Sequence, residues 1–343
     1  MALIAAIGMD TYPENPNLID FTIGYPLFQE EKREGIKLDT VAANNLGEAI
    51  DMWECRNAWR FAAGKVRVVL FGEEAARNGL QGFFDYLQLP VADDNASVVV
   101  VRGRSHEVLR AKLPETVRIA VHIETMLRTA YQEGHTIRSR MADLSTKAVV
   151  PGFDPVLPLL ELQGENRIAL VGAALFADTR MVGSISQNEA QLLLALYGMV
   201  PVDRLTIIIG ESAELSKPAV EIELLKPKAR LKPKLVDGEA QVGIDFKANY
   251  ILRSYGSKVD LRKRETIDAV TRDIEATLYL EIQQLLAKLQ AMQVDPLGVG
   301  KSLRAKNYRQ VDPADLRQLW ANATIDLQVK LRPFRAGAIH PTK

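Results

Sequence analysis

The stretch that decides the fold class is VRVVLFGEEAARNGL, residues 66–80. Residues 66–71 are a short, mostly apolar run, which is typical of a buried strand, and Gly72 ends it. The residues that follow, 73–87, have the pattern of a helix that begins with two acidic side chains. A strand that leads directly into a helix predicts an α/β arrangement.

The sequence on both sides of this stretch continues the alternation. We predict strands over 3–8, 18–25 and 98–101, a loop over 29–37, and helices over 40–60, 105–111 and 116–132. Gly134 closes the last of these helices. The order of elements predicts a partly parallel sheet covered by helices.

Prolines and a glycine between 151 and 158 interrupt the chain, and we place a boundary near them. After it we predict strands over 157–163, 168–176, 180–185 and 205–209, with Asp178-Thr179 at a tight connection. A short helix over 188–197 begins at Ser186 or Asn188, since both residue types cap helix N-termini.

The last third of the chain has a different organisation. Apolar residues alternate over 220–224 and 242–250, and Asp237-Gly238 between them suits a hairpin turn. Apolar residues three or four apart predict one long amphipathic helix over 262–292. Pro313 opens a short helix, and 325–331 forms a closing strand. This pattern predicts an antiparallel sheet with one face packed on the long helix.

The predicted fold class is therefore a mixture of α/β and α+β, with mixed and antiparallel sheets packed against helices. We expect three modules. They are an N-terminal α/β domain over 1–150, a small middle α/β domain over 151–212, and a C-terminal domain with the long helix over 213–343.

Composition excludes several classes of protein. Of the 343 residues, 47% are hydrophobic and 25% charged, which is typical of a globular protein rather than a disordered one. Lys and Arg number 43, as do Asp and Glu, so a dedicated nucleic-acid binder is not expected. No stretch approaches the ~20 consecutive apolar residues of a membrane-spanning helix.

The candidate catalytic and ligand-binding motifs are weak. The sequence LGVGKS at 297–302 ends like a phosphate-binding loop, but Asp295 stands where that loop needs glycine, so we expect a helix exit instead. The four histidines, His106, His122, His135 and His340, include no pair with helical metal-site spacing. We expect partial burial of Cys55, which has no partnered base, and a helix-terminal role for Glu73 and Glu74. No catalytic, cofactor-binding or metal residue is predicted.

Five cations lie within nine residues, at Lys226, Lys228, Arg230, Lys232 and Lys234, with Pro227 and Pro233 between them. Alternating charge with proline is typical of an edge strand that resists aggregation. The same charges would also be attracted to anionic lipid or to an acidic partner. Both interpretations remain open from the sequence.

Four separate stretches carry a resemblance to one known family. They are AIGMD at 6–10, VVLFGEEAARNGL at 68–80, a set from PVLP at 155–158 through GAALF at 172–176 and MVG at 181–183 to Glu189, and DPLGVG at 295–300 with Trp320 and the strand ending at Leu331. Together they resemble the Ger(x)C family, the C subunits of bacterial spore germinant receptors. The order and spacing hold across nearly the whole chain.

The resemblance implies a multi-domain α/β lipoprotein without enzymatic activity and without a cofactor. Its members are held at the outer face of the spore inner membrane by an N-terminal lipid. They work with the integral A and B subunits of the receptor, in an assembly that senses nutrients and triggers germination. The implied role is a scaffold for protein interactions.

The beginning of this sequence departs from the family pattern. It lacks the basic region and long apolar core of a signal peptide and the lipidated cysteine, so we expect an extracytoplasmic segment that begins just after the anchor. The alternatives are a soluble α/β enzyme or a small-ligand-binding lipoprotein. The best candidate site for the enzyme is the end of the strand over 66–71, where Gly72 and the next helix could hold an anion, and the lipoprotein would also need a pocket.

Overall fold

The computed structural model describes residues 2–15, 17–29, 32–57, 60–62, 66–80, 83, 94–114, 116, 118–198, 201–208, 219–255 and 263–335. The chain forms two compact units. Unit 1 consists of residues 1–129, 138–150 and 154–185, and unit 2 consists of residues 130–137, 151–153 and 186–343.

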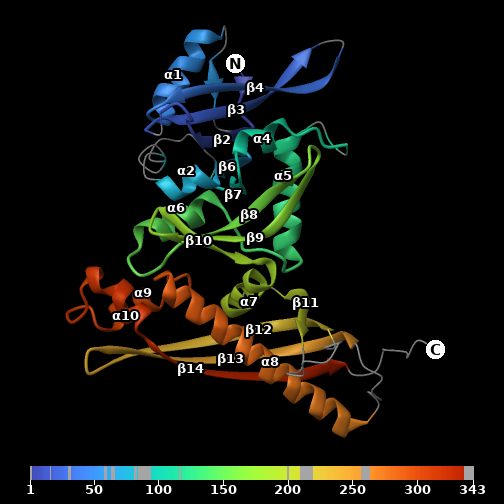
Figure 1. Cartoon of the computed structure of the whole chain (residues 1–343), viewed down its shortest axis with the longest axis vertical. Coiled ribbons are helices and arrows are strands. Elements are labelled where there is room, and N and C mark those ends of the chain that lie inside the picture. Colours follow the sequence, from blue (N-terminus) through green and yellow to red (C-terminus); the bar gives the residue numbers. More distant parts are fainter. Residues whose placement is uncertain are drawn as a thin grey trace. The chain divides into compact units, whose positions relative to one another are not determined.

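An eight-stranded sheet forms the centre of unit 1, in the order β10-β9-β8-β7-β6-β2-β3-β4 (Figure 1). Its strands are β2 (Ala6–Thr11), β3 (Ile19–Gln29), β4 (Lys32–Ala43), β6 (Val68–Gly72), β7 (Ser97–Arg102), β8 (Val156–Gln163), β9 (Arg167–Ala177) and β10 (Arg180–Ser186). Neighbours from β2 through β6 and β7 to β8 are parallel, whereas β3, β4 and β9 join by antiparallel pairing. β1 (Ala2–Leu3) and β5 (Phe61–Ala62) form a small parallel pair.

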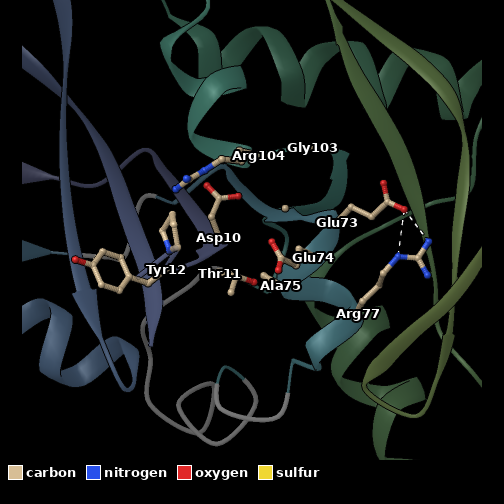
Figure 2. A pocket seen from close by; sticks show the side chains of 11 residues that line it. Asp10, Thr11, Tyr12, Glu73, Glu74, Ala75, Arg77, Gly103 and Arg104 are labelled. Carbon is tan, nitrogen blue, oxygen red and sulfur yellow. Dashed lines mark hydrogen bonds and ion pairs between the residues drawn. The ribbon is translucent and has the colours of Figure 1, made fainter. Parts of the chain in front are cut away.

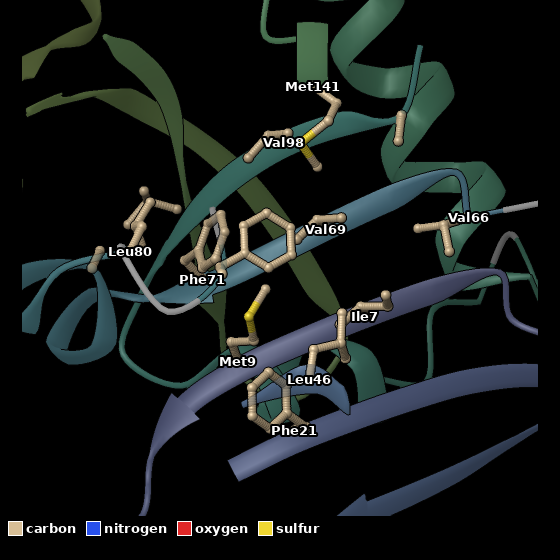
Figure 3. Packing of buried hydrophobic residues seen from close by; sticks show 14 of the residues in the cluster. Ile7, Met9, Phe21, Leu46, Val66, Val69, Phe71, Leu80, Val98 and Met141 are labelled. Carbon is tan, nitrogen blue, oxygen red and sulfur yellow. The ribbon is translucent and has the colours of Figure 1, made fainter. Parts of the chain in front are cut away.

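Helices cover both faces of this sheet because its central strands are apolar on both sides. They are α1 (Leu46–Arg56), α2 (Glu73–Asn78), α4 (Ser105–Arg110), α5 (Ile119–Gln132) and α6 (Met141–Val149). On β6, Val69 and Phe71 pack in a cluster with residues of α1, α2 and α6 (Figure 3). Val68 and Leu70 pack on the opposite face with residues of α4 and α5. The prediction of a partly parallel sheet covered by helices is confirmed.

Unit 2 contains a four-stranded sheet in the order β11-β12-β13-β14. Its strands are β11 (Val202–Ile208), β12 (Ala219–Val236), β13 (Glu239–Tyr255) and β14 (Thr324–Arg335). The helical elements are α7 (Gln187–Tyr197), α8 (Arg264–Ala291), α9 (Val299–Lys306), the 3-10 turn η1 (Pro313–Asp315) and α10 (Leu316–Ala321). The apolar stripe of α8 is buried from Val270 to Leu289, as its spacing predicts.

The ends of α7 are set by capping residues that can be recognised in the sequence. Ser186 accepts a hydrogen bond from the Glu189 backbone, and the Glu189 side chain accepts one from the Ser186 backbone. This reciprocal pair satisfies two amides that the helix itself leaves without partners. Gly198 then ends the helix in the left-handed conformation, with φ of 66°.

Three local predictions were wrong. The expected loop over 29–37 is mostly strand, because β3 and β4 form a long hairpin whose backbone pairing does not depend on apolar side chains. The expected helix over 40–60 begins only at Leu46, after β4. The helix expected over 73–87 ends at Asn78, where Gly79 has a φ of 110° that a helix cannot continue.

The C-terminal sheet is not wholly antiparallel, because β14 runs parallel to β13, with Gln241 opposite Thr324. A parallel neighbour requires a long crossover connection, and the segment that contains α8 provides it. The middle segment 151–212 is shared between the units. β8 pairs with β7 and extends the first sheet, whereas α7 and β11 belong to unit 2. The division into three domains, 1–150, 151–212 and 213–343, stays a prediction.

Candidate functional site: a charged cleft at the edge of the larger sheet

A cleft of about 410 Å³ lies where the parallel strands β2, β6 and β7 end (Figure 2). Ligands of α/β sheets generally bind at this edge, outside the carboxyl ends of the strands. The charged side chains that line the cleft are Asp10, Glu73, Glu74, Arg77 and Arg104. The cleft therefore coincides with the site that the sequence suggested for an anion.

Asp10 places its own carboxylate beside Gly72, and the helix that it caps is α4 rather than α2, the helix that the sequence suggested for an anion. The Asp10 side chain is only 2% exposed and accepts hydrogen bonds from the backbone of Ser105 at 2.7 Å and of His106 at 3.0 Å. The Ser105 hydroxyl donates a third, at 3.0 Å. The first amides of a helix lack internal partners and carry partial positive charge, which a carboxylate stabilises. The Asp10 carboxylate therefore caps the N-terminus of α4.

Gly72 allows this close approach. A Cβ at residue 72 would lie 2.1 Å from Oδ1 of Asp10 and 3.1 Å from the backbone oxygen of Gly103. The Glu73 amide donates to that same Gly103 oxygen at 3.1 Å, which ties the end of β6 to the end of β7. Only a residue without a side chain fits between the strand end and the buried carboxylate.

A second carboxylate stands beside the first. Asp20 lies opposite Asp10 in the β2–β3 register, and its Oδ2 accepts a hydrogen bond from Arg104 Nη2 at 2.8 Å. Burial raises the pKa of Asp20, although the Arg104 guanidinium acts in the opposite direction. Burial also lowers the pKa of His106.

The two carboxylates of the Glu73-Glu74 pair do not act as a dyad. Glu73 forms an ion pair with Arg77, four residues later, at 2.7 Å (Figure 2). Glu74 is exposed. Adjacent helical residues diverge by about 100°, so one substrate atom cannot meet both carboxylates. Their position at the start of α2 fits the predicted helix-terminal role.

The other candidate residues lie apart from the cleft. Cys55 is exposed near the end of α1, so the expectation of partial burial was wrong; the helix buries Trp53 instead. His122 is half-buried on α5, and His340 lies outside the described residues. Within the described ranges, no serine, threonine or cysteine side chain hydrogen-bonds to a histidine. A nucleophile with an adjacent base is not assembled there.

The LGVGKS segment begins a helix rather than ending one. Gly298 adopts a left-handed φ of 69° just before α9. Asp295 then accepts hydrogen bonds from the amides of Val299 at 3.1 Å and Gly300 at 2.7 Å. The residue that breaks the phosphate-loop pattern therefore satisfies the amides that a phosphate would need.

The structure also groups residues that the sequence left apart. In unit 2, potential metal-ligand atoms of Glu133, His135 and Asp203 lie within 4.8 Å of one another. The Asp203 amide donates to the Glu133 backbone oxygen, and the buried Gln191 amide lies 3.3 Å from His135 Nδ1. The backbone hydrogen bond joins the segments that carry Glu133 and Asp203. The 68-residue separation of His135 from Asp203 hides the grouping from sequence analysis.

The fold and cleft define a two-unit α/β protein whose buried acids cap its own helices. Residues 1–162 match the model described as "Spore germination protein N-terminal domain", and residues 171–335 match "Spore germination B3/ GerAC like, C-terminal". Because the two models together span nearly the whole chain, the chain belongs to the GerAC-like spore germination family.

Two individual proteins show the same relationship. YfkR of Bacillus subtilis (strain 168), whose name places it provisionally among spore germination proteins, is 19% identical over 322 residues, which span 89% of this chain and 80% of YfkR. The crystal structure of the GerBC protein superposes with a TM-score of 0.62 at 15% identity, covering 96% of this chain and 97% of GerBC. At this identity the superposition shows that the fold is shared, and it confirms the predicted fold class.

Proposed function

We propose that this chain is the extracytoplasmic part of the C subunit of a nutrient germinant receptor and acts without catalysis. In the full-length protein, an N-terminal lipid holds it at the outer face of the spore inner membrane. There it contacts the integral A and B subunits as a scaffold. The observation that carries this proposal is the family match over both residues 1–162 and residues 171–335.

The chemistry of the cleft supports a role other than catalysis. Asp10 accepts hydrogen bonds from the first amides of α4, and Asp20 accepts a hydrogen bond from Arg104. A general base needs a carboxylate or imidazole that is free to accept a proton from substrate, and neither of these two buried acids is free. Among the helices that the structure describes, none is long and apolar enough to cross a membrane.

The decisive experiment deletes the full-length gene from the spore-forming source. Germination is recorded on single nutrients and on a trigger that bypasses nutrient receptors. Loss of one nutrient response, with the bypass intact and the response restored by the wild-type gene, is the expected result. Normal responses to every nutrient, in a strain that lacks paralogous receptors, would contradict the proposal.

A second candidate is binding of a small polar ligand in the cleft. Its volume of about 410 Å³ falls within the ~300–1,000 Å³ usual for ligand sites. Calorimetric titration with small polar nutrients tests this function directly. Glu74→Gln changes an exposed carboxylate of the cleft wall, and Glu165→Gln is a matched change of an exposed residue elsewhere. Binding that only the first substitution weakens supports the candidate, and equal weakening or no binding contradicts it.

A further inference from the structure

The face of the four-stranded sheet opposite α8 is strongly basic. Inward-facing residues of β13, such as Val242, Ile244 and Phe246, are buried, whereas the alternate residues point away from the core. On β12, this outer face carries four exposed cations: Lys228, Arg230, Lys232 and Lys234. The sheet register extends the face across two further strands.

Cations on the neighbouring strands lie in the same face. Lys228 is opposite Lys247 of β13, and Lys247 is opposite Lys330 of β14. Arg332 lies one side-chain repeat beyond Lys330. Between Lys228 and Arg332 the face thus holds seven cations against two carboxylates, Asp245 and Asp326. Asp245 is bound to Lys232 at 2.6 Å.

The row of lysines works against the stability of the sheet. Directly opposite side chains are about 5 Å apart, and like charges at that distance are destabilising. None of Lys228, Lys247 and Lys330 forms an ion pair with another residue that the structure describes. Three like charges in register therefore need a reason outside the folding of this sheet.

Protection of a sheet edge does not explain the row. β11 pairs with β12 only up to Leu224, so the rest of β12 is an edge where lysine would discourage aggregation. Lys306 of α9 already binds the Pro233 backbone oxygen at this edge. Lys247, however, lies on β13, which is paired on both sides. Its charge contributes to the face and protects no edge.

The side chains of this face also indicate the kind of partner. Between the charged groups it presents the small or polar residues Gln241, Gly243, Asn249, Thr324 and Gln328, and its exposed apolar side chains among the described residues, Val236 and Phe334, lie at the ends of β12 and β14. Protein interfaces are enriched in aromatic residues and depleted in lysine, and single-stranded nucleic acid is bound through aromatic stacking. A flat array of lysines with no aromatic anchor at its centre suits a fluid anionic surface.

We propose that this basic face docks on the anionic phospholipid headgroups of a membrane surface. Cations sit about 7 Å apart along each strand and neighbouring strands about 5 Å apart, so several can approach a bilayer together. The chain has no net charge, so it is attracted to an anionic surface only when its basic face is turned toward that surface. The proposal rests on this surface and is independent of the receptor assignment.

The test is co-sedimentation of the chain with vesicles of phosphatidylcholine alone, or with a third of that lipid replaced by phosphatidylglycerol. The expected result is binding to the anionic vesicles that molar salt abolishes, because screening shortens to about 3 Å at 1 M. The triple variant Lys228→Gln, Lys247→Gln, Lys330→Gln should bind about a hundredfold more weakly, at about fivefold per charge. Circular dichroism checks that it remains folded.

The matched control removes three exposed cations of unit 1, with Lys112→Gln, Arg128→Gln and Arg167→Gln. It changes the net charge equally and should keep the affinity of the unmodified chain. Equal losses in both triple variants, or equal binding to the two vesicle types, would overturn the proposal. Tighter binding to duplex DNA than to the anionic vesicles, sensitive to the same three lysines, would overturn it in favour of nucleic acid.

Discussion

Glu281 on α8 provides a sharp test of the packing of unit 2. Its Oε2 is buried and has no hydrogen-bond partner among the described residues. Burial raises the pKa of this carboxyl from 4.5 to about 7. Replacing it by the isosteric, neutral Gln removes the charge and leaves the volume almost unchanged. We expect Glu281→Gln to stabilise the folded chain at high pH and to have little effect at low pH.

The sign follows from which state binds the proton more tightly. Below pH 4.5 the carboxyl is protonated in both the folded and the unfolded chain, so it has no effect on stability. Between pH 4.5 and about 7 the unfolded chain loses its proton first, and the folded state loses stability. Above about pH 7 the full cost of the buried charge is present.

A rise from 4.5 to about 7 corresponds to at most ~3.4 kcal/mol. Partial exposure of the side chain reduces the expected effect to about 2 kcal/mol. Urea unfolding followed by circular dichroism at about pH 5 and about pH 8 measures it. Because part of the effect is already present at pH 5, the stability difference between Glu281→Gln and the unmodified chain should grow by about 1–1.5 kcal/mol between these pH values.

Any effect of Glu281→Gln on side-chain packing contributes equally to the free energy of unfolding at both pH values. It therefore cancels when the stability change at one pH is subtracted from that at the other. The matched control is Asp273→Asn, which removes the same charge from an exposed position of the same helix. A difference for Glu281→Gln that is the same at both pH values would refute the inference that this carboxyl is buried without a partner.

Three further changes test other parts of the structure. Gly72→Ala should destabilise unit 1 by about 1–3 kcal/mol in thermal unfolding, because its Cβ would lie 2.1 Å from Asp10; a melting temperature equal to that of the unmodified chain would contradict the tight contact. Asp295→Ala should cost unit 2 about 2 kcal/mol in urea unfolding, because two buried amides lose their acceptor, and retained stability would mean that another group caps α9. Burial lowers the pKa of Lys147 from 10.5 to about 8, so the folded state disfavours its charge most below pH 8. Lys147→Met should therefore stabilise by about 1–2 kcal/mol at neutral pH, with a gain that shrinks as the pH rises through 8 to 10.5; a constant gain would point to packing alone.

The candidate cleft illustrates what could be predicted from local sequence. The run 66–71 followed by Gly72 indicated a strand end with a helix beyond it, and the structure places the cleft there. The sequence could not show that Asp10 fills the start of α4, because the two segments are 95 residues apart. That long-range contact places a buried carboxylate beside Gly72, at the edge where the sequence suggested an anion site.

Local periodicity also placed the hairpin of β12 and β13 and the long helix α8. Their apolar repeats of two and of three to four residues depend only on which side chains face the core. The polar hairpin of β3 and β4 has no such pattern over 29–37 and was predicted as a loop. Backbone pairing with a neighbouring strand, which carries no local sequence pattern, decides its structure.

The sequence by itself determined the residue types that must be buried, the helices and strands that follow from them, and a resemblance that the family match confirms. Tertiary structure alone decided which strands are neighbours. It paired β8 with β7 and β14 with β13, and it aligned Lys228, Lys247 and Lys330 in one row. Strand pairing joins residues distant in the chain through backbone hydrogen bonds common to all residue types, so only the folded chain specifies it.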